Sequence, residues 1–497
     1  MHSKRVSSIL IFLGAFAWMS IDYGIVDIFS KRPQSLHQWR QTDCLSFTEN
    51  YYSFGAKFNE PQVHNMASTE GKASGEFPIL YFTVAQIWKI TGKSEGIYRL
   101  FSMLIALLGF YALFRISFRL TNSSIVSIIA PLLLYSSALF PFYAWNFLPN
   151  VPALSFAFLS VWLLLQWNSE NKTHQLIIAI LFICLAGLIK ISSLIAPLAA
   201  LGSIFIFSIN NKRKVLLVIA SMLVLSLSLY AWYSYSQAYN VAYASNAFIL
   251  DFVPIWNLSS SEIDHVLEIF NAHWRTHFYS ETAYFLFFSL ALISLLIFIV
   301  RQMWKALSFA LILGIGALSY ILLFFQNLGY HDYYLVELFI IPAAICIGFL
   351  YAIKEWEHPW FKTLGIALFA IFIYTEAGHA RSKMAERFND FYNEHHLKHF
   401  KVLENLDAQL TALEIGPNDL VISIPDDAPN ISLYLINRRG FSNYGNKNRD
   451  RESIEASIKA GAKFLFVNEP SLLEENYLEP FTQDQVYQKD NLTIYRL

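Results

Sequence analysis

Charged residues are scarce in this chain. Only 15% of its 497 residues are Asp, Glu, Lys or Arg, whereas 55% are hydrophobic and 16% are aromatic. The net charge is −1, so the chain lacks the basic excess that a nucleic-acid partner would need. This balance excludes an ordinary soluble protein and is typical of a membrane protein.

Cysteines and nucleotide-binding motifs are also rare or absent. The three cysteines, Cys44, Cys184 and Cys346, lie far apart, and their spacing fits neither a disulfide framework nor a zinc site. No Asp-x-Asp occurs anywhere, although transferases that use nucleotide sugars commonly hold a metal with that pattern. No G-x-G-x-x-G or P-loop follows a predicted strand either. A nucleotide-sugar donor is therefore not expected.

Long apolar runs are present in abundance. Runs of about 17–25 residues can cross the roughly 30 Å of hydrocarbon in a bilayer, and they recur up to residue 378 and then cease. The first follows the basic stretch Met1–Arg5 and is expected to be a retained signal anchor rather than a cleaved signal peptide. We predict about eleven transmembrane helices, at residues 9–21, 97–118, 124–143, 150–167, 174–190, 192–209, 215–236, 283–300, 306–326, 332–353 and 360–378.

The basic residues orient these segments. When the amino terminus is placed inside, the predicted segments obey the positive-inside rule, because every basic cluster then faces the cytoplasm. These clusters are Arg115 and Arg119, Lys172, Lys212–Lys214, Arg301 and Lys305, and Lys354 and Lys362. Residues 30–96, a second large loop at 237–282 and the tail then face outward. Residues 76–90 are too short to span and are predicted to form an interfacial helix in the first outer loop.

The tail differs in character from the rest of the chain. A charged, helix-periodic stretch at 380–413 is followed by alternating strand and helix signals, namely a strand at 419–424, a helix at 427–440, a helix at 452–460, a strand at 463–467 and a final pair at 485–487 and 492–495. We therefore predict a polytopic α-helical membrane protein with a transmembrane domain at 1–378 and a small soluble α/β domain at 379–497.

The stretch His37-Gln-Trp-Arg-Gln-Thr-Asp43 carries the strongest candidate for chemistry. It places a carboxylate, an arginine, a histidine and a tryptophan close together at the predicted outer membrane surface. A lone aspartate in such a loop is most often an ordinary solvated acid. The residues alone therefore leave the role of Asp43 open.

A family resemblance narrows that choice. The matching pieces are Trp39–Asp43, Glu49–Gly55 with Pro61, Gly75–Tyr81, and Gly92, Glu95, Arg99 and Ser102. Residues 37–102 thus resemble the first outer loop of the glycosyltransferase C superfamily, in particular bacterial transferases similar to the lipid A aminoarabinose transferase and to protein O-mannosyltransferases.

The resemblance implies roles for individual residues. In that superfamily an acidic residue of this loop is the catalytic base, which corresponds to Asp43, and a His-Pro-Pro-like interfacial helix follows, where this chain has Glu76-Phe-Pro78. The likeness continues more weakly at Ala186–Lys190 and Tyr330–Tyr334. Many members have Glu after the loop Asp, whereas Cys44 follows here, so a role that needs a paired Asp-Glu is in doubt.

The chemistry of sugar transfer asks for similar residues. A base takes the acceptor proton, and cations stabilise the charge on the departing phosphate. Lys190, Arg40, His331 and Arg99 are the predicted phosphate ligands, and the predicted pocket residues are His37, Trp39, Glu76, Tyr333, Tyr334 and Glu337. Alternatives remain for some of them, since Lys190 fits a snorkelling lysine at a helical hairpin, and His331 fits an interfacial aromatic cluster.

Together these observations predict an integral membrane glycosyltransferase of a bacterial inner membrane, with its site and tail facing the periplasm. It would move a sugar, with inversion, from a polyprenyl-phosphate carrier to a hydroxyl of a glycan, lipid or protein. The sequence assigns no cofactor and leaves a divalent metal open. Other interpretations are a polysaccharide ligase or polymerase that uses loop 237–282, a lipid-sugar transporter or flippase, and a scaffold that displays the tail.

Overall fold

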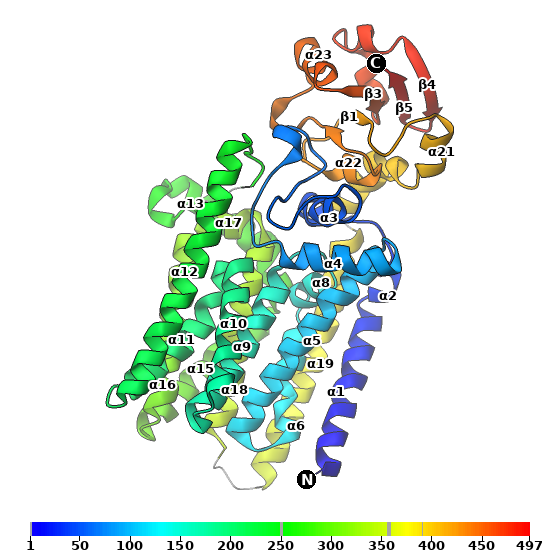
Figure 1. The fold of residues 1–497 in the computed structure, drawn as a ribbon. Helices are drawn as coiled ribbons and strands as arrows, with labels where there is room; N and C mark the ends of the chain where they lie inside the picture. Colours follow the sequence, from blue (N-terminus) through cyan, green and yellow to red (C-terminus); the bar gives the residue numbers. More distant parts are fainter. Residues whose placement is uncertain (1, 249–251, 355–358, 390) are drawn as a thin grey trace. The chain divides into compact units, whose positions relative to one another are not determined.

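The computed structural model describes residues 2–248, 252–354, 359–389 and 391–497 (Figure 1). By their internal contacts the residues form two compact units. Unit 1 consists of Met1–Phe29, Arg99–Trp232 and Asp251–Ala385. Unit 2 consists of Ser30–Tyr98, Tyr233–Leu250 and Glu386–Leu497, so the tail shares its unit with the first predicted outer loop. The predicted division into domains at residue 378 stays a prediction.

Unit 1 is built from helices throughout its described part. In chain order these are α1 (His2–Asp22), α2 (Ile25–Ile28), α5 (Glu95–Thr121), α6 (Ser124–Ser127), α7 (Ile129–Tyr135), α8 (Leu139–Ala144), α9 (Asn150–Glu170), α10 (Thr173–Ile189), η2 (Ile191–Leu194), α11 (Ile195–Phe207), α12 (Lys212–Ala242), η3 (Ile255–Asn257), α13 (Ser260–Ile269), η4 (Phe270–Trp274), α14 (Arg275–Phe278), α15 (Glu281–Val300), α16 (Trp304–Leu323), α17 (Phe325–Tyr330), η5 (Asp332–Phe339), α18 (Ile340–Ala352) and α19 (Pro359–Asn389). The start of α5, the last part of α12 and the end of α19 belong to unit 2.

Seven stretches in the described part of the chain are long and apolar enough to cross a membrane. They are α5, α9, α12, α15, α16, the run Asp332–Ala352, and the run Thr363–Ala412 that begins in α19. Four apolar helices are shorter, at Val6–Asp22, Ser124–Tyr135, Thr173–Ile189 and Ile191–Phe207. The chain is therefore an integral membrane protein with a helix in every predicted segment, while the number of true spans stays a prediction.

The structure departs from the predicted segments in two places. Residues 124–143 form the short helices α6, α7 and α8, and the break before α8 follows from Pro141, which cannot donate the backbone hydrogen bond that a continuous helix needs. Residues 360–378 do not end at the predicted tail boundary, because α19 continues to Asn389. The loop between Lys354 and Lys362 lies largely outside the described residues.

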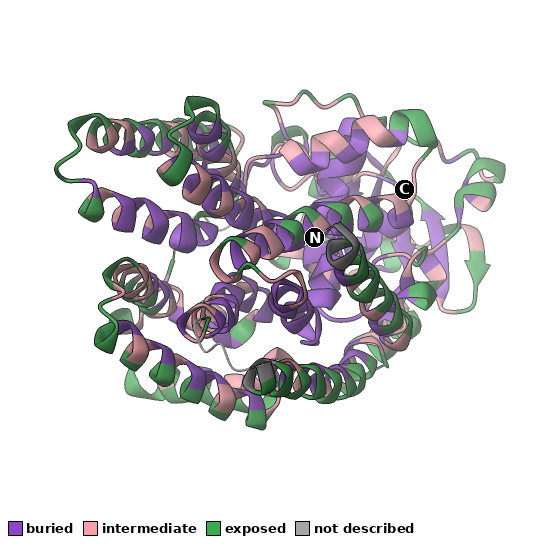
Figure 2. Cartoon of the chain, turned by 90° about the horizontal axis from the view of Figure 1, so that it is seen from below, coloured by how far each residue is buried: buried purple, intermediate pink, exposed green. Residues whose placement is uncertain are grey.

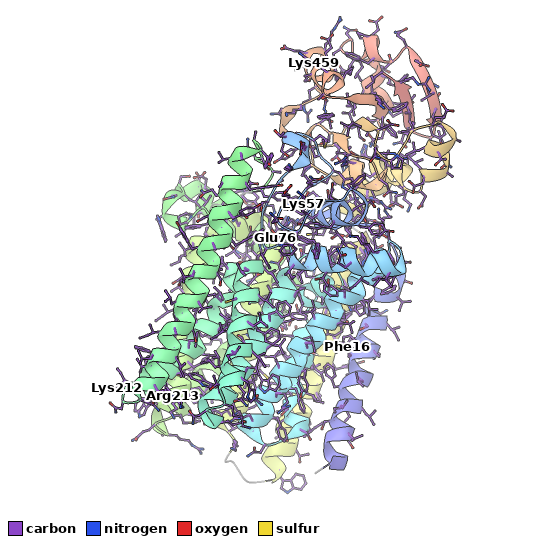
Figure 3. All side chains as sticks on the ribbon, in the orientation of Figure 1. Phe16, Lys57, Glu76, Lys212, Arg213 and Lys459 are labelled. Atoms are coloured by element: carbon purple, nitrogen blue, oxygen red, sulfur yellow. The ribbon has the colours of Figure 1, made fainter. Side chains whose placement is uncertain are left out.

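The basic clusters of unit 1 gather at one end of its helices. The Arg119 guanidinium donates to the Ser169 hydroxyl, and the Lys214 ammonium donates to the Asn168 carbonyl at 2.7 Å. Figure 3 shows Lys212 and Arg213 at the same end of unit 1 as the chain's amino terminus in Figure 1. Two of the clusters that the positive-inside rule places in the cytoplasm, Arg115 with Arg119 and Lys212–Lys214, thus lie at the same end of unit 1.

Burial separates the central helices of unit 1 from the peripheral ones. In their most apolar windows, 78% of α9 but only 22% of α12 and 17% of α16 is buried inside the protein. Large apolar side chains such as Leu223, Phe285, Phe288 and Ile315 are exposed, and exposed faces line the outer helices in Figure 2. These faces suit a lipid environment, since a soluble protein rarely exposes so much apolar surface.

Unit 2 contains a five-stranded sheet in the order β2-β1-β3-β5-β4. Strands β1 (Leu420–Ile424), β2 (Gly440–Phe441) and β3 (Ala462–Val467) are parallel, and β4 (Asp484–Lys489) and β5 (Leu492–Arg496) join antiparallel. The helices α22 (Ile431–Leu435) and α23 (Arg451–Lys459) lie between these strands in the chain. The predicted alternation of the tail is confirmed. The helix predicted at 427–440 is wrong in its bounds, because α22 covers only Ile431–Leu435 and Gly440 lies in β2, a strand of two residues that was not predicted.

Unit 2 also contains smaller helical elements. They are η1 (Thr69–Gly71), α20 (Phe391–His395), η6 (His396–Phe400), η7 (Lys401–Leu403), α21 (Asp407–Ala412), η8 (Tyr444–Asn446), η9 (Pro470–Glu474) and η10 (Glu479–Phe481).

The first predicted outer loop packs into this unit through two helices and a short strand-like segment. The helices are α3 (Gln38–Ser53) and α4 (Ile79–Thr91), and α4 matches the helix predicted at 76–90. Residues 64–66 run beside β2, with hydrogen bonds from Met66 N to Gly440 O at 2.7 Å and from Gly440 N to His64 O at 3.0 Å. The loop therefore extends the edge of the sheet beyond β2.

Candidate functional site

Helix α3 is polar and yet almost wholly buried. Its sequence contains Arg40, Asp43, Glu49 and Asn50, and all four side chains are buried. Polar groups are unfavourable in a protein interior unless they are hydrogen-bonded. Helix α3 must therefore find its partners on the elements around it, and those partners define the candidate site.

Asp43 has one satisfied and one unsatisfied carboxylate oxygen. It is 1% exposed, and its Oδ1 accepts a hydrogen bond of 2.8 Å from the Asn430 Nδ2. Its Oδ2 lies 3.9 Å from Arg40 Nη1 and accepts no hydrogen bond within the described part of the chain. Burial raises the pKa of Asp43 to about 6, against the opposing effects of Arg40 and Asn430. The group can therefore exchange a proton near neutral pH.

Arg40 is held by a second carboxylate. Its guanidinium donates to Glu76, which also accepts from the Tyr81 hydroxyl. The Arg40 guanidinium also lies 5.8 Å from the ring centre of Phe248. The structure thus joins the predicted phosphate ligand Arg40 to the predicted pocket residue Glu76, and a phosphate at Arg40 would have to compete with that carboxylate.

The other predicted residues of this stretch, His37 and Trp39, lie at the start of α3. His37 is buried and precedes the helix with φ 53° and ψ 38°, a left-handed conformation that turns the chain into α3. The Gln41 amide donates to the carbonyl of Leu36 at 2.9 Å and so holds the turn. Trp39 is half-buried.

Unit 1 brings together a second group of predicted residues. Lys190 ends α10, and its ammonium lies 4.7 Å from the ring centre of Tyr334 and 5.9 Å from that of Tyr333. His331 stacks on Tyr333, with the ring centres 5.3 Å apart and the planes inclined by 9°. Helices flank Lys190 on both sides, as predicted, with α10 before it and η2 and α11 after it.

Glu337 lies in the same group. It is fully buried, its Oε1 accepts a hydrogen bond of 2.9 Å from Asn150 Nδ2, and its Oε2 accepts none within the described residues. The Asn150 Nδ2 also donates to the Tyr333 carbonyl at 3.1 Å, so it ties the Glu337 carboxylate to the segment that carries the tyrosines. We call Lys190, His331, Tyr333, Tyr334 and Glu337 the lysine cluster.

Arg99 has different surroundings. It is 4% exposed, its Nη1 donates to the Phe29 carbonyl at 3.0 Å, and its guanidinium lies 4.4 Å from the ring centre of Phe147. These contacts anchor Arg99 near the end of α2. Its role as a phosphate ligand stays a prediction.

Sequence reasoning missed the two amides that hold the buried carboxylates. Asn430 is 387 positions away from Asp43 in the chain, and Asn150 is 187 positions away from Glu337. Neither amide has a local motif, because only the fold brings these residues to their partners. Among the described residues, no three His, Cys, Asp or Glu side chains lie close enough together to hold a metal ion.

Comparisons with known proteins bear on this geometry. Residues 75–233 match the family model for dolichyl-phosphate-mannose-protein mannosyltransferase. The structure of ArnT from Cupriavidus metallidurans in the apo state is 12% identical, with a TM-score of 0.58 over 99% of this chain and 98% of that chain. The chain has a glycosyltransferase C fold. The predicted resemblance to that superfamily is thus confirmed.

A second ArnT structure from the same organism is bound to undecaprenyl phosphate. It is 12% identical, with a TM-score of 0.56 over 98% of this chain and 97% of that chain. No curated protein matches the sequence. Of the glycosyltransferase C residues predicted here, Glu76, Arg99 and Lys190 fall within the range of the family match, whereas Asp43 and Glu337 fall outside it.

Proposed function

We propose that this chain is a glycosyltransferase that moves a sugar from a polyprenyl-phosphate donor to an acceptor hydroxyl at the periplasmic face of a bacterial inner membrane. The observation that carries the proposal is the Asp43 carboxylate, which is buried, has one oxygen without a hydrogen bond, and has a pKa raised to about 6 by burial. The glycosyltransferase C fold and the family match at 75–233 support it.

In the proposed reaction, Asp43 acts as general base. Its Oδ2 accepts the proton of the acceptor hydroxyl while the hydroxyl oxygen forms a bond to the anomeric carbon of the sugar. The bond from that carbon to the phosphate oxygen breaks, and the electron pair leaves with the polyprenyl phosphate. A single displacement of this kind inverts the anomeric centre.

The lysine cluster suits the departing phosphate. The Lys190 ammonium lies against aromatic rings and forms no salt bridge in the described part of the chain, although its charge acts on the Glu337 carboxylate. A phosphate would be a second anion for this ammonium. Unit 1 also contains an apolar cavity of about 970 Å³, whose lining includes Ala196 on α11 and Ile340, three residues beyond Glu337. The ArnT structure with undecaprenyl phosphate supports a donor on a polyprenyl carrier.

Asp43→Asn tests the proposal. The amide cannot take the acceptor proton, so we expect transfer to fall by roughly 100-fold or more, while the binding of undecaprenyl phosphate changes little. Surface glycolipids and glycoproteins are compared by mass spectrometry in cells that lack the gene and carry either variant or wild-type chain. Binding of undecaprenyl phosphate to the purified chain is measured separately.

Asp264→Asn is the matched control. Asp264 is an exposed acid on α13, within the predicted loop 237–282, and we expect its amide to leave transfer unchanged. Substantial transfer by Asp43→Asn at normal abundance would overturn the assignment of the base. Loss of transfer in the control instead would favour the alternative of a ligase that works through this loop.

A further inference from the structure

Asn430 occupies the N-cap position of α22, where an asparagine side chain normally caps the helix. It is the residue that precedes α22, and the side chain at this position commonly accepts a hydrogen bond from the second or third backbone N–H of the helix. Here Asp426 takes that role, because its Oδ2 accepts from Ser432 N at 2.7 Å. The Asn430 side chain makes no capping bond and is used elsewhere.

Its partners lie on α3 and in the 64–66 segment. The Asn430 Oδ1 accepts from the backbone N–H of Asn65 at 3.1 Å and from the Ser46 hydroxyl at 3.2 Å, and Asn430 Nδ2 donates to Asp43 Oδ1 at 2.8 Å. A backbone N–H can only donate, so the amide atom that faces Asn65 must be the oxygen. The Nδ2 group is thereby directed at Asp43.

Other contacts hold this arrangement in place. The Asn65 amide donates to the Pro429 carbonyl at 2.8 Å and to the Ser442 hydroxyl at 3.0 Å, so the segment before α22 is fixed from both sides. Ser46 also pairs with His64 Nδ1 at 2.7 Å. The Asn430 side chain is fully buried within this network.

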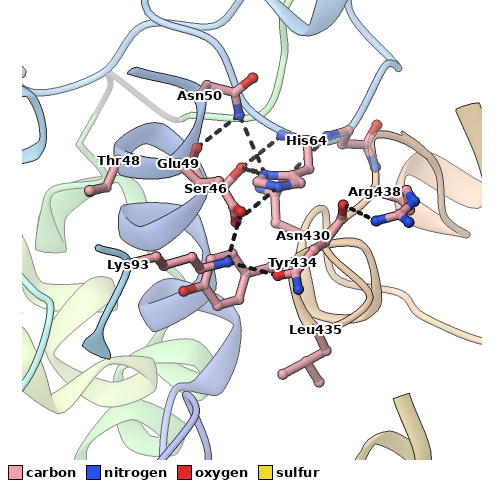
Figure 4. Close-up of polar contacts among 12 residues, drawn as sticks. Ser46, Thr48, Glu49, Asn50, His64, Lys93, Asn430, Tyr434, Leu435 and Arg438 are labelled. Atoms are coloured by element: carbon pink, nitrogen blue, oxygen red, sulfur yellow. Dashed lines mark hydrogen bonds and ion pairs between the residues drawn. The ribbon is translucent and has the colours of Figure 1, made fainter. Parts of the chain in front are cut away.

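A polar network continues from His64, whose pKa is lowered by burial, to Glu49 and Lys93 (Figure 4). His64 Nε2 lies 3.3 Å from one Glu49 oxygen, and the Lys93 ammonium lies 2.7 Å from the other. Burial alone would raise the pKa of Glu49, but Lys93 and His64 lower it to about 2. Glu49 therefore stays charged at neutral pH and fixes His64, which in turn contacts Ser46.

We propose that Asn430 is a positioning residue for Asp43: its amide binds Oδ1 and leaves Oδ2 as the oxygen that receives the proton. This inference rests on the proposed function, because it assigns the partner of the proposed base. It also gives the C-terminal segment a part in the reaction, since Asn430 belongs to the tail rather than to the first loop.

The groups around Asp43 determine how loss of the Asn430 amide would change the pKa of Asp43. Asp43 is influenced by Arg40 on its own helix and by Glu76, and it acts in turn on Cys44 and on Tyr444 from the tail. A donated hydrogen bond favours the charged carboxylate. Without the Asn430 amide, the pKa of Asp43 should rise above its present value of about 6.

The direction of the effect on rate follows from the role of a base. Asp43 works only when it is deprotonated, so transfer declines as pH falls through its pKa. When Asn430→Ala raises that pKa, the acid limb of the rate profile moves to higher pH, by about one unit. A merely structural loss would reduce transfer at every pH and leave the limb in place.

The experiment measures transfer in membrane vesicles that contain the full chain with its own donor and acceptor, from about pH 5 to about pH 8. Asn430→Ala should shift the acid limb upward. Asn430→Asp keeps the volume but places an acceptor opposite Asp43 Oδ1, so it should shift the limb at least as far. If the alanine variant does not fold, the aspartate variant gives the reading.

Asn443→Ala is the matched control. Asn443 is another buried amide of the tail, and its side chain accepts from Asp426 N at 2.9 Å and donates to the carbonyls of Lys447 and Asn448. We expect it to lower the amount of folded protein without moving the limb. An unmoved limb in both Asn430 variants, or an equal shift in the control, overturns the inference. Transfer by Asp43→Asn would instead overturn the proposed function.

Discussion

Two buried carboxylates share one local design. Asp43 and Glu337 each accept a single hydrogen bond, in both cases from an asparagine amide, and each has a second oxygen that accepts none within the described residues. Asp426 offers a contrast, because burial raises its pKa to about 7 while backbone N–H groups of Ala428 and Ser432 satisfy it. A raised pKa therefore does not by itself mark a candidate base. An unsatisfied oxygen does not do so alone either, since Glu49 Oε2 and Glu404 Oε1 also accept no hydrogen bond among the described residues, and only Asp43 combines it with a raised pKa and a family motif.

At the same scale, Lys190 should hold the donor phosphate. Its ammonium lies against aromatic rings and forms no salt bridge among the described residues, so Lys190→Ala should weaken binding of undecaprenyl phosphate by about 10-fold or more, as expected for a lost charge-assisted hydrogen bond. Titration of the purified chain with undecaprenyl phosphate measures the effect. Lys190→Arg should restore part of the affinity.

Lys212→Ala serves as the control for that titration. Lys212 is an exposed lysine at the start of α12, at the basic end of the helices of unit 1, and it does not line the apolar cavity. We expect its loss to change affinity much less. Equal affinities for Lys190→Ala and the wild-type chain would remove Lys190 from the donor site.

Among the elements, the contact between residues 64–66 and β2 links the first loop to the tail. Gly440 lies between the 64–66 segment and β1, and a Cβ built there would lie 1.9 Å from the Val421 carbonyl oxygen. No other residue type fits this position without moving one of the strands. The glycine therefore sets the distance at which Asn65, and through it Asn430, meets α3.

Gly440→Ala should accordingly destabilise unit 2. The clash is with backbone and not with a flexible side chain, so we expect a loss of about 1–3 kcal/mol in the free energy of unfolding, as for other overpacked sites. Thermal unfolding of the purified chain would show a lower Tm. Gly378→Ala is the control, since a Cβ there meets nothing within 4 Å, and an equal drop in Tm for both variants would contradict the explanation.

The elements were predictable to different degrees. Composition and hydrophobic period were enough for the membrane helices and for β1, β3, β4 and β5, because burial imposes those patterns locally. The break before α8 was not predicted, although Pro141 signals it in hindsight. The contact of residues 64–66 with β2 has no sequence signal, since hydrogen bonds between distant backbone segments depend on no side chain.

Some residues of the candidate site were also predictable from the sequence, and others were not. Asp43, Lys190 and Glu337 could be singled out because charge is rare in an apolar chain and the family motifs fall beside them. Asn430 and Asn150 could not, because an asparagine carries no charge and its partner is set by the tertiary fold. The resemblance predicted Asp43 as the base, and the structure was needed to find the amide that contacts it.

For the molecule as a whole, the distribution of charge predicts its orientation. The net charge is only −1, yet basic residues collect at one end of the helices of unit 1. The opposite end of α9 carries Asn150, which bonds to Glu337. A helix of this length rises about 30 Å, so the basic end and the lysine cluster are about one membrane thickness apart.

This separation gives a topology that labelling can check. Arg213, Lys57 and Lys459 are all exposed (Figure 3), and the native Cys44 and Cys346 are buried and Cys184 half-buried, which keeps the background low. In intact spheroplasts, a membrane-impermeant maleimide should label Lys57→Cys and Lys459→Cys, because the first loop and the tail are predicted to face outward. Arg213→Cys should react only after permeabilisation, since the positive-inside rule retains its cluster in the cytoplasm. The opposite result would be labelling of Arg213→Cys in intact spheroplasts without labelling of Lys57→Cys or Lys459→Cys. It would show that the predicted topology is reversed and that Asp43 faces the cytoplasm, where no polyprenyl-linked sugar is expected.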